Sequence, residues 1–480
     1  MARFSVGEIA EAVGGAFAHG AALADTAVSG ISTDTRTLAR GAAFFALAGE
    51  NHDAHDHLAE AVGKGAGLLV VSDASKAPAG FAGAVLKVGD TLRAYQELAA
   101  YCRKRLNPLV IAVTGSVGKT TLKDMIACIL SASYRVVSTE GNLNNQIGLP
   151  RTILGADEGT EILVLEMGMA RAGEIERLAE IARPGIAAIT NIGVSHRENF
   201  DSGDGILYAK YEIAAFLGAG DALVIDAANS EALSQLSGRS SREKGYAVLR
   251  VAQAGTEAAK SADYAVSDVR FGDGCDIALF EIEDAASGGK TAFSIPASGA
   301  YVGVTAALAA AVCARTGVSL QASARALKNL ARTPHRLETI RKGGILVIDD
   351  TYNASPDSAK SGLEFLGIVP AERRIAALAD MNELGGESEI LHREVGAAAA
   401  AAGTDILFAY GEKARAIAAG AAGAPGIAEI YSYGADEKAA LVTHLREIVR
   451  PGDAVYIKGS RSMKMEEAVR ALTEDAKWHI

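Results

Sequence analysis

The chain has 480 residues, of which 49% are hydrophobic and only 5% aromatic, and its formal net charge is −11. The length suggests about three domains, and the many small and aliphatic residues favour layered α/β domains over an aromatic-rich all-β fold. The acidic balance argues against a nucleic-acid partner or an anionic membrane surface, because no broad basic face is expected.

The cysteines do not form a recognisable site. Cys102, Cys128, Cys275 and Cys313 are scattered, with no Cys-x-x-Cys pair, so neither a structural zinc site nor a disulfide framework is indicated. The first residues lack a long apolar segment, and nowhere do 18 or more apolar residues run together. We therefore expect a soluble, cytoplasmic protein without a membrane span.

Short apolar runs separated by polar or helical segments predict a small α/β domain over residues 1–87. A helix follows it and leads to the strand Leu109–Val113. The runs of the first domain are Ala43–Leu47, Gly67–Val71 and Ala84–Val88.

Residues 88–331 alternate regularly between buried strands and helices, which predicts a doubly wound, mostly parallel central sheet. Between Asp263 and Pro296 the pattern changes to short alternating segments with glycine turns, which predicts an antiparallel extension. The expected strands are Glu161–Met167, Ile186–Ile192, Ala222–Ile225 and Ala247–Val251, and the expected helices include Ala172–Ile181 and Val304–Arg315.

A new α/β series begins near Thr333 and predicts a Rossmann-like C-terminal domain over residues 332–480. The alanine-rich run Ala397–Ala402 fits one face of a helix. The expected strands are Gly344–Ile348, Ile375–Ala379, Ile406–Ala409, Ile427–Tyr431 and Ala454–Ile457.

The most specific motif, Thr114-Gly-Ser-Val-Gly-Lys-Thr-Thr121, lies between the strand Leu109–Val113 and a helix-compatible segment. Glycines there let backbone N–H groups converge on a phosphate, Lys119 can neutralise it, and the Thr120 hydroxyl can bind Mg²⁺. The loop is shorter than the general P-loop, since Val113 stands in place of the first glycine. The motif predicts a nucleoside triphosphate site, with an ordinary glycine turn as the alternative.

Two further candidates follow strands of the same predicted sheet. Glu166 ends one strand and His196 follows another, and open α/β sheets bind ligands at this edge. Glu166 is therefore a candidate Mg²⁺ ligand. A lone histidine is more often structural, but this position in a domain with a phosphate loop favours a functional His196.

Several segments resemble the Mur ligases, the ATP-dependent enzymes that add amino acids to the peptidoglycan precursor, and within them the D-alanyl-D-alanine-adding branch. The similarity extends over nearly the whole chain in order, and the shortened phosphate loop is also the family's form. The segments are Thr190-Asn-Ile-Gly-x-x-His196-x-Glu198-x-Phe200, Ala209-Lys-x-Glu-Ile213, Gly141-Asn-Leu-Asn-Asn145-x-Ile147-Gly-x-Pro150, Glu166-Met-Gly-Met169 with Gly173-Glu-Ile175, Pro334-His-Arg-Leu-Glu338 and Asp349-Asp-Thr-Tyr-Asn-Ala-Ser-Pro356.

The resemblance implies a metal and phosphate site in the central domain. Lys119 and Thr120 would hold ATP phosphates and one Mg²⁺, and Glu166 and His196 would serve the metals. Lys210 matches a lysine that CO₂ can carbamylate, which would turn a cation into an anionic ligand for a second Mg²⁺. The alternative for Lys210 is a surface helix lysine.

In the C-terminal domain the resemblance implies that Arg336 approaches the phosphates and that Asp350 holds the ribose; a polar turn with a helix cap is the alternative for the Asp349–Asn353 loop. No base-binding residue is assigned, because Gly299–Val302 departs from the family's pattern. The full implied ATP site is Gly115, Ser116, Val117, Gly118, Lys119, Thr120, Thr121, Asn145, Arg336, Asp350 and Asn353, with Lys119, His196, Lys210 and Arg336 as the catalytic groups.

Two substrate sites are implied more weakly. Asp380, Glu383, His392 and Lys458 would line the site of the incoming dipeptide, although a charged strand end is also typical of a solvated rim. Ser32, Asp34 and Arg36 would hold the uridine nucleotide, although by themselves these residues fit a simple turn.

The expected reaction is therefore ATP-dependent formation of an amide bond between UDP-N-acetylmuramoyl-tripeptide and D-alanyl-D-alanine, by a monomer. One alternative is another Mur-type ligase, either a diamino-acid-adding enzyme or a folylpolyglutamate synthase. The Asp-Asn-Pro-Arg segment of the diaminopimelate-adding relatives is absent from the sequence. An alternative from another class is a P-loop switch ATPase, and a non-catalytic binding module fits least well.

Overall fold

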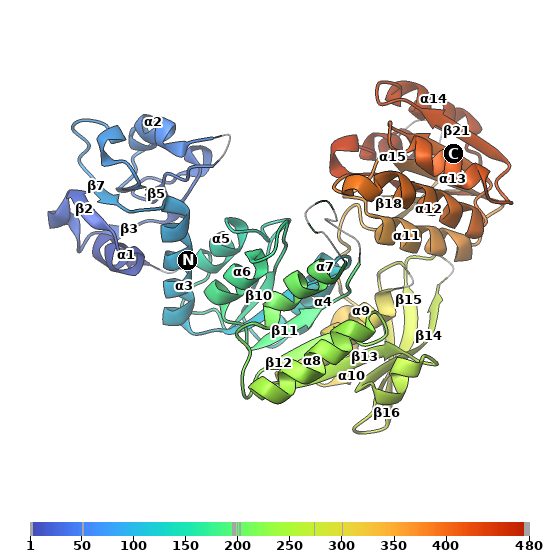
Figure 1. Ribbon diagram of the computed structural model, residues 1–480, viewed down its shortest axis with the longest axis horizontal. Coiled ribbons are helices and arrows are strands. Elements are labelled where there is room, and N and C mark those ends of the chain that lie inside the picture. Colours follow the sequence, from blue (N-terminus) through green and yellow to red (C-terminus); the bar gives the residue numbers. More distant parts are fainter. Residues whose placement is uncertain are drawn as a thin grey trace.

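The computed structural model describes residues 3–49, 52–193, 198, 200, 203–272, 274–299 and 301–474. Three α/β domains follow one another along the molecule, from the N-terminal domain in blue to the C-terminal domain in orange and red (Figure 1). This arrangement confirms the predicted fold class. None of the helices in the described part of the chain combines the length and apolar character that crossing a membrane requires.

The N-terminal domain is a small α/β unit. Its helices and strands are β1 (Phe4–Ser5), α1 (Val6–Val13), β2 (Ala16–His19), β3 (Ala27–Val28), β4 (Ile31–Ser32), β5 (Ala43–Phe45), α2 (Leu58–Gly63), β6 (Leu68–Val71) and β7 (Ala84–Lys87). Five of the strands form one sheet in the order β2-β7-β6-β5-β4, parallel except for β2. Strands β5 and β6 are fully buried, as parallel strands covered on both faces require.

Helix α3 (Thr91–Leu106) connects this domain to the next one. It begins where the Asp90 side chain accepts hydrogen bonds from two backbone N–H groups of the first turn. Its Tyr95 packs edge-on against Phe45, with ring centroids 5.4 Å apart, and its Leu98 shares one apolar core with Val110 of the central sheet. The first two domains are therefore packed through α3.

The central domain carries the largest sheet. Its helices and strands are β8 (Leu109–Thr114), α4 (Lys119–Leu130), β9 (Val136–Ser138), α5 (Gly148–Leu154), β10 (Ile162–Glu166), α6 (Glu174–Ala182), β11 (Ile186–Ile189), α7 (Gly203–Tyr211), β12 (Ala222–Asp226), α8 (Glu231–Lys244), β13 (Ala247–Gln253), β14 (Tyr264–Phe271), β15 (Ala278–Asp284), β16 (Gly289–Ile295), α9 (Val302–Ala314) and α10 (Leu320–Leu327). The nine strands are ordered β16-β15-β14-β13-β12-β11-β8-β10-β9. Pairing is parallel from β9 to β14 and antiparallel from β14 to β16, as predicted.

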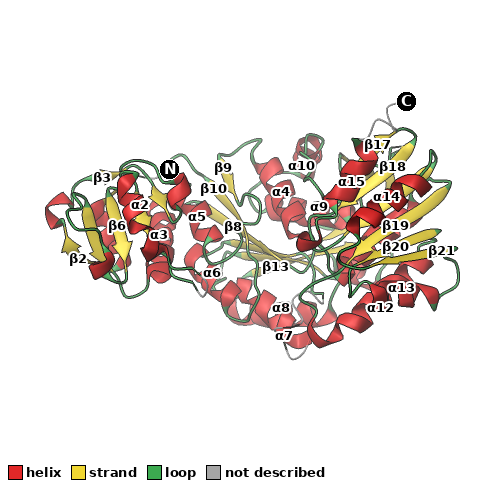
Figure 2. Ribbon diagram, turned by 90° about the horizontal axis from the view of Figure 1, so that it is seen from above, coloured by secondary structure: helices red, strands yellow, loops and turns green. Residues whose placement is uncertain are grey.

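Helices cover both faces of the central sheet, with α4, α9 and α10 on one side and α6, α7 and α8 on the other (Figure 2). Strand β8 shows why: Val110 and Ala112 belong to one apolar core, and Ile111 and Val113 belong to the core on the opposite face. Successive side chains of a strand point to opposite faces, so the side chains of a continuous apolar strand pack into two cores, one on each face of the sheet. Strand β8 lies between β10 and β11, which brings the carboxyl ends of these three strands together.

The C-terminal domain is Rossmann-like. Its helices and strands are β17 (Glu338–Lys342), β18 (Ile345–Asp350), α11 (Pro356–Ile368), β19 (Arg373–Ala379), α12 (Ser388–Ala401), β20 (Ile406–Tyr410), α13 (Arg415–Ala422), β21 (Glu429–Tyr433), α14 (Lys438–Ile448), β22 (Asp453–Lys458) and α15 (Glu466–Thr473). The six strands are ordered β17-β18-β22-β19-β20-β21, and all pair in parallel except β17 with β18.

Every strand expected from the sequence is present within a few residues of its predicted bounds. Strand β17 was not expected, because its sequence Glu-Thr-Ile-Arg-Lys alternates weakly and is only partly buried. It forms because its backbone pairs antiparallel with β18 at the edge of the sheet. The predicted domain boundaries at residues 87/88 and 331/332 stay predictions.

Candidate active site

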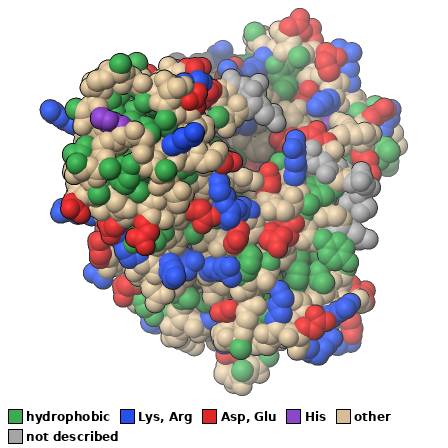
Figure 3. Space-filling view, turned by 60° about the vertical axis from the view of Figure 1, so that its left-hand side comes forward, with side chains coloured by type: hydrophobic (Ala, Val, Ile, Leu, Met, Phe, Trp, Pro, Cys, Tyr) green, Lys and Arg blue, Asp and Glu red, His purple; other side chains and the backbone are tan. Residues whose placement is uncertain are grey.

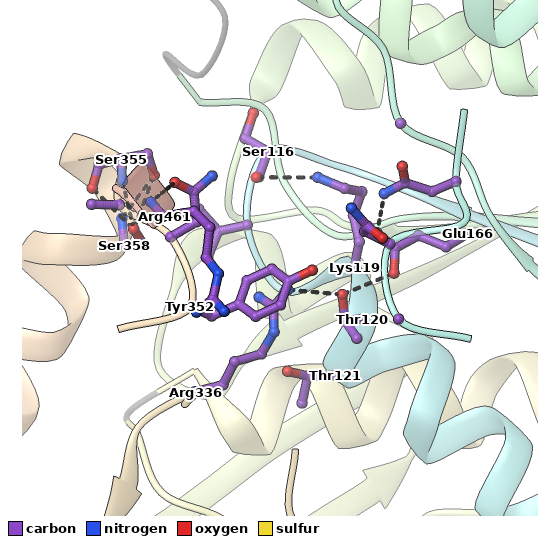
Figure 4. Close-up of a pocket in the computed structure, with 18 of the residues that line it drawn as sticks. Ser116, Lys119, Thr120, Thr121, Glu166, Arg336, Tyr352, Ser355, Ser358 and Arg461 are labelled. Atoms are coloured by element: carbon purple, nitrogen blue, oxygen red, sulfur yellow. Dashed lines mark hydrogen bonds between the residues drawn. The ribbon is translucent and has the colours of Figure 1, made fainter. Parts of the chain in front are cut away.

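A large cavity with a volume of about 1260 Å³ lies between the central and C-terminal domains. In Figure 4, Lys119, Thr120 and Glu166 converge on one side of it, and Arg461 lies on the other side beside Ser355. The face drawn in Figure 3 intermixes Lys and Arg with Asp and Glu rather than gathering one sign. The predicted ATP-site residues that line the cavity are Ser116, Val117, Gly118, Lys119, Thr120, Thr121, Asn145, Arg336, Asp350 and Asn353.

The glycine loop joins β8 to α4 by a path that requires two glycines. Gly115 has φ +148° and a side chain there would place Cβ 1.8 Å from the Thr190 hydroxyl oxygen, and Gly118 has φ +83° directly before α4. L-residues rarely adopt such backbone angles. The Lys119 ammonium folds back over the loop and donates to the Gly115 carbonyl oxygen at 2.8 Å.

The segment after β11 fastens this loop, a role that the sequence did not reveal. The Asn191 side-chain oxygen accepts the backbone N–H groups of Ser116 at 3.0 Å and Val117 at 2.8 Å. The Thr190 hydroxyl donates to the Val117 carbonyl oxygen at 2.6 Å. The signal that could have indicated it is the Thr-Asn pair at the end of a strand neighbouring β8.

The two predicted oxygen ligands for a metal lie in contact. The Thr120 hydroxyl donates to Glu166 Oε2 at 2.8 Å, and the Asn144 amide donates to Glu166 Oε1 at the same distance. From the sequence we expected Asn145, and not Asn144, to belong to the ATP site. The side-chain oxygen of Asn145 accepts two backbone N–H groups at the start of α5, so it shapes the loop, although the residue also lines the cavity.

Lys210 of α7 is buried, with 2% of its surface exposed. Its ammonium donates to the Gly115 carbonyl oxygen at 3.1 Å. Burial lowers the pKa of Lys210 well below its ordinary value, and the nearby charge of Lys119 lowers it further. A surface helix lysine is thereby excluded. His196, the other predicted metal residue of this region, lies outside the described residues.

Glu212, two residues after Lys210, caps α6. Its carboxylate accepts the backbone N–H groups of Gly173 at 2.7 Å and Glu176 at 3.1 Å. A carboxylate at a helix N-terminus satisfies unpaired N–H groups and interacts favourably with the helix dipole. This contact gives a physical reason for a glutamate at that position beside Lys210.

Arg336 extends from the segment between the domains to the glycine loop. Its Nη2 donates to the Thr120 hydroxyl oxygen at 3.1 Å, and its guanidinium stacks on the Tyr352 ring at 4.1 Å from the centroid. The segment is held by His335, whose Nδ1 lies 2.7 Å from Asp349 Oδ2. The C-terminal half of the chain therefore supplies a cation to the proposed phosphate site.

Asp350 and Lys458 form a buried ion pair at the base of the cavity. The Lys458 ammonium donates to Asp350 Oδ2 at 2.5 Å and to the Asn353 carbonyl oxygen at 2.9 Å, and the Tyr456 hydroxyl donates to the same carboxylate. Burial raises the pKa of Asp350 and lowers that of Lys458. Both residues line the cavity, but these contacts already engage the groups expected to meet the ribose and the dipeptide.

Two of the residues predicted for the dipeptide lie elsewhere. His392 is completely buried and its ring nitrogens bond to backbone groups of Met381 and Ser388, and Asp380 accepts a backbone N–H and also lies outside the cavity lining. Neither side chain therefore reaches the cavity in this structure, and their assignment to the dipeptide site stays a prediction. Glu383 does line the cavity.

The three residues predicted for the uridine nucleotide are together, in the N-terminal domain. The Ser32 hydroxyl donates to the Asp34 carbonyl oxygen at 2.9 Å, and Arg36 pairs with the Asp34 carboxylate at 2.7 Å. The hydrogen bond from Arg36 lowers the pKa of Asp34 to about 2. None of the three lines the cavity at the glycine loop.

Comparison with known proteins agrees with this architecture. The sequence matches the Mur ligase middle domain over residues 113–314 and the Mur ligase glutamate ligase domain over residues 335–461. It is 37% identical to the UDP-N-acetylmuramoyl-tripeptide–D-alanyl-D-alanine ligase of Bacillus subtilis, over 99% of both chains. A crystal structure of MurF from Acinetobacter baumannii has a TM-score of 0.87 at 28% identity, covering 98% of this chain and 99% of that one.

A second solved structure, MurF from Thermotoga maritima in complex with ADP, has a TM-score of 0.80 at 26% identity and covers 92% of this chain and 96% of that one. The chain belongs to the Mur ligase family. Within that family, its near full-length relatives are the ligases that join D-alanyl-D-alanine to UDP-N-acetylmuramoyl-tripeptide.

Proposed function

We propose that the chain joins D-alanyl-D-alanine to UDP-N-acetylmuramoyl-tripeptide in peptidoglycan precursor synthesis, and that ATP is converted to ADP and phosphate as the amide bond forms. The observation that carries the proposal for this site is the contact of Arg336 with Thr120 at 3.1 Å. This hydrogen bond joins the segment that leads into the C-terminal domain to the end of the glycine loop, and both residues line one cavity. A nucleotide and a second substrate can bind side by side in that cavity.

The chemical problem is that a carboxylate is a poor electrophile. Transfer of the γ-phosphoryl group of ATP to the terminal carboxylate of the tripeptide gives an acyl phosphate. The amine of the dipeptide then attacks the carbonyl carbon, the C–O bond breaks, and phosphate leaves. We assign to Lys119 and Arg336 the task of offsetting negative charge as the phosphoryl group moves.

The proposed Mg²⁺ site rests on the donor atoms of this chain. The Thr120 hydroxyl and the Glu166 carboxylate are the oxygen ligands that Mg²⁺ prefers, and they lie 2.8 Å apart. A bound Mg²⁺ would reduce the repulsion between phosphate oxygens and the attacking carboxylate. Asn144 holds the other oxygen of Glu166 and so fixes the orientation of the carboxylate.

We also propose that Lys210 reacts with CO₂ to form a carbamate. The reaction forms an N–C bond and releases one proton, and it requires the neutral amine. Burial and the charge of Lys119 both lower the pKa of Lys210, so the neutral amine forms at a lower pH than it would in an ordinary lysine. A carbamate would be an anion beside the cation of Lys119 and would add oxygen ligands for a second metal.

One chain supplies the glycine loop, the proposed metal ligands and Arg336 to a single cavity. This supports our proposal that the enzyme works as a monomer, and its need for ATP supports a cytoplasmic location.

A P-loop switch ATPase would use the same glycine loop without an acceptor, so the two functions predict different ATP turnover. For the ligase we expect continuous ADP formation only when UDP-tripeptide and D-alanyl-D-alanine are both present, because without the amine each enzyme molecule stops after forming one ADP and one acyl phosphate. A coupled assay for ADP, with each substrate omitted in turn, measures this. Full-rate ADP formation with neither substrate would favour the switch ATPase.

A further inference from the structure

One imidazole and two carboxylates meet where the chain enters the C-terminal sheet. They belong to His335, Glu338 and Asp349, and one donor atom of each lies within 4.8 Å of the donor atoms of the other two. Among the described residues, no other three histidine, cysteine or acidic side chains come together in this way. The ligation mechanism proposed above assigns no chemical step to them.

The pairing of two strands places the carboxylates side by side. Glu338 begins β17 and lies directly opposite Asp349 of β18, at the edge of the sheet (Figure 2). Like charges directly opposite one another destabilise a pair of strands. In the described part of the chain, neither carboxylate forms an ion pair with a lysine or an arginine, and His335 is the basic side chain beside them. The pair therefore lacks a permanent positive charge.

Hydrogen bonds hold both carboxylates in place without neutralising them. The Asp349 side chain is 2% exposed, and its Oδ1 accepts the Thr351 backbone N–H at 3.0 Å and the Thr351 hydroxyl at 2.7 Å. Glu338 Oε2 accepts the backbone N–H of His335 at 3.1 Å. Because a buried charge without a charged partner is unfavourable, a cation between these carboxylates would be bound favourably.

The turn that carries His335 brings its ring to the same point. His335 has φ +60°, in the left-handed region that histidine enters more often than most residues. Its carbonyl oxygen accepts the Tyr352 backbone N–H at 3.1 Å, and its Nδ1 lies 2.7 Å from Asp349 Oδ2. The side chain is 39% exposed, so an ion and its water can reach the ring from solvent.

We propose that His335, Glu338 and Asp349 bind one divalent transition-metal ion of the zinc class. Imidazole nitrogen suits Zn²⁺, whereas Mg²⁺ prefers a shell of oxygen ligands, so this site differs in chemistry from the all-oxygen pair of Thr120 and Glu166. A water molecule would complete a tetrahedral shell. The neutral ring would bind the ion through Nδ1 and carry its proton on Nε2.

A bound ion would act on the segment between the domains. Arg336 lies between two of the ligands in sequence, and its guanidinium reaches Thr120. The ion would fasten this segment to β18 and so hold the start of β17 in place. The inference concerns a metal site alone and does not depend on the proposed ligase function.

Co²⁺ replaces Zn²⁺ at such sites and absorbs visible light when four ligands surround it, so it reports binding directly. The full chain, freed of metal and kept in excess Mg²⁺, is titrated with Co²⁺. We expect about one Co²⁺ per chain, with visible absorption that Zn²⁺ removes. His335→Gln and Asp349→Asn should lose this absorption. Zn²⁺ should also raise the unfolding temperature of the wild type and leave that of His335→Gln unchanged.

His57→Gln is the matched control, because His57 is 43% exposed and its Nδ1 also lies near a carboxylate, 3.6 Å from Glu60. It should bind Co²⁺ as the wild type does, and so should Glu166→Gln. Thermal unfolding without metal shows which variants fold. Should His335→Gln not fold, Glu338→Gln, which keeps the pair of His335 and Asp349, should still bind Co²⁺ more weakly than the wild type.

Two results would overturn the proposal. The first is a wild type that shows no visible Co²⁺ absorption in excess Mg²⁺, which would leave His335 as a simple partner of Asp349. The second is absorption that persists in His335→Gln and disappears in Glu166→Gln, which would place the ion at the proposed Mg²⁺ site instead.

Discussion

Replacing Lys119 with alanine should lower kcat/KM for ligation by about 1,000-fold, the upper range for one group that stabilises transition-state charge. The free energy of unfolding should change little. The reason is that, among the described residues, the hydrogen bonds of the Lys119 ammonium go to backbone carbonyl oxygens of its own loop, so the side chain contributes charge rather than core packing. Steady-state kinetics and thermal unfolding of the same preparation measure the two effects separately.

Lys360→Ala provides the control for this prediction. Lys360 pairs with Glu394 at 2.7 Å in the C-terminal domain and does not line the cavity, so its loss should leave ligation unchanged. Ligation by Lys119→Ala within a few-fold of the wild type would contradict the assignment of the ATP site to this loop.

Lys210→Ala should be nearly inactive and should regain part of its activity when acetate or formate is added. Formation of the carbamate changes the charge of the Lys210 side chain by about two units, from a cation to an anion. A cation there would repel a second divalent metal ion, whereas the carbamate would bind it. A small carboxylate can enter the space left by the buried side chain and supply the missing oxygens. Activity with and without added carboxylate measures the rescue, and removal of CO₂ should lower the activity of the wild type.

A matched control exists on α8. Lys244 also donates to a backbone carbonyl oxygen, that of Ala215 at 2.8 Å, but it is exposed. Lys244→Ala should stay active and should not respond to acetate. If Lys210→Ala also keeps most of its activity, or if acetate restores nothing, Lys210 does not act as a carbamate.

The pH dependence of the wild type follows from the same chemistry. Because only the neutral amine reacts with CO₂, activity should fall as the pH is lowered and Lys210 becomes protonated. The lowered pKa of Lys210 moves this loss to lower pH than an ordinary lysine would give.

The sequence predicted much of the fold because its strands are buried on both faces and therefore read as continuous apolar runs. Strand β8 is one example, with side chains that alternate between two cores. The glycine loop was equally visible, since Gly115 and Gly118 adopt backbone angles that other residues rarely tolerate.

The contacts that position the site were less visible. Asn191 and Asn144 act through side-chain oxygens and amides that reach across neighbouring strands, and a sequence does not state where such atoms point. Lys210 looks like a surface lysine by composition, and only the packing of α7 buries it. Lys458 lines the cavity and His392 does not, and both are engaged by partners within the C-terminal domain.

The most direct test of the central claim is the mass of the product. The protein is incubated with ATP, Mg²⁺, UDP-N-acetylmuramoyl-tripeptide and D-alanyl-D-alanine, and the nucleotide products are analysed by mass spectrometry. We expect the UDP-linked pentapeptide, heavier than the tripeptide substrate by one dipeptide less one water, with one ADP formed for each molecule. A product that appears only when UDP-linked dipeptide and a single diamino acid are supplied, or no amide product at all, would contradict the account.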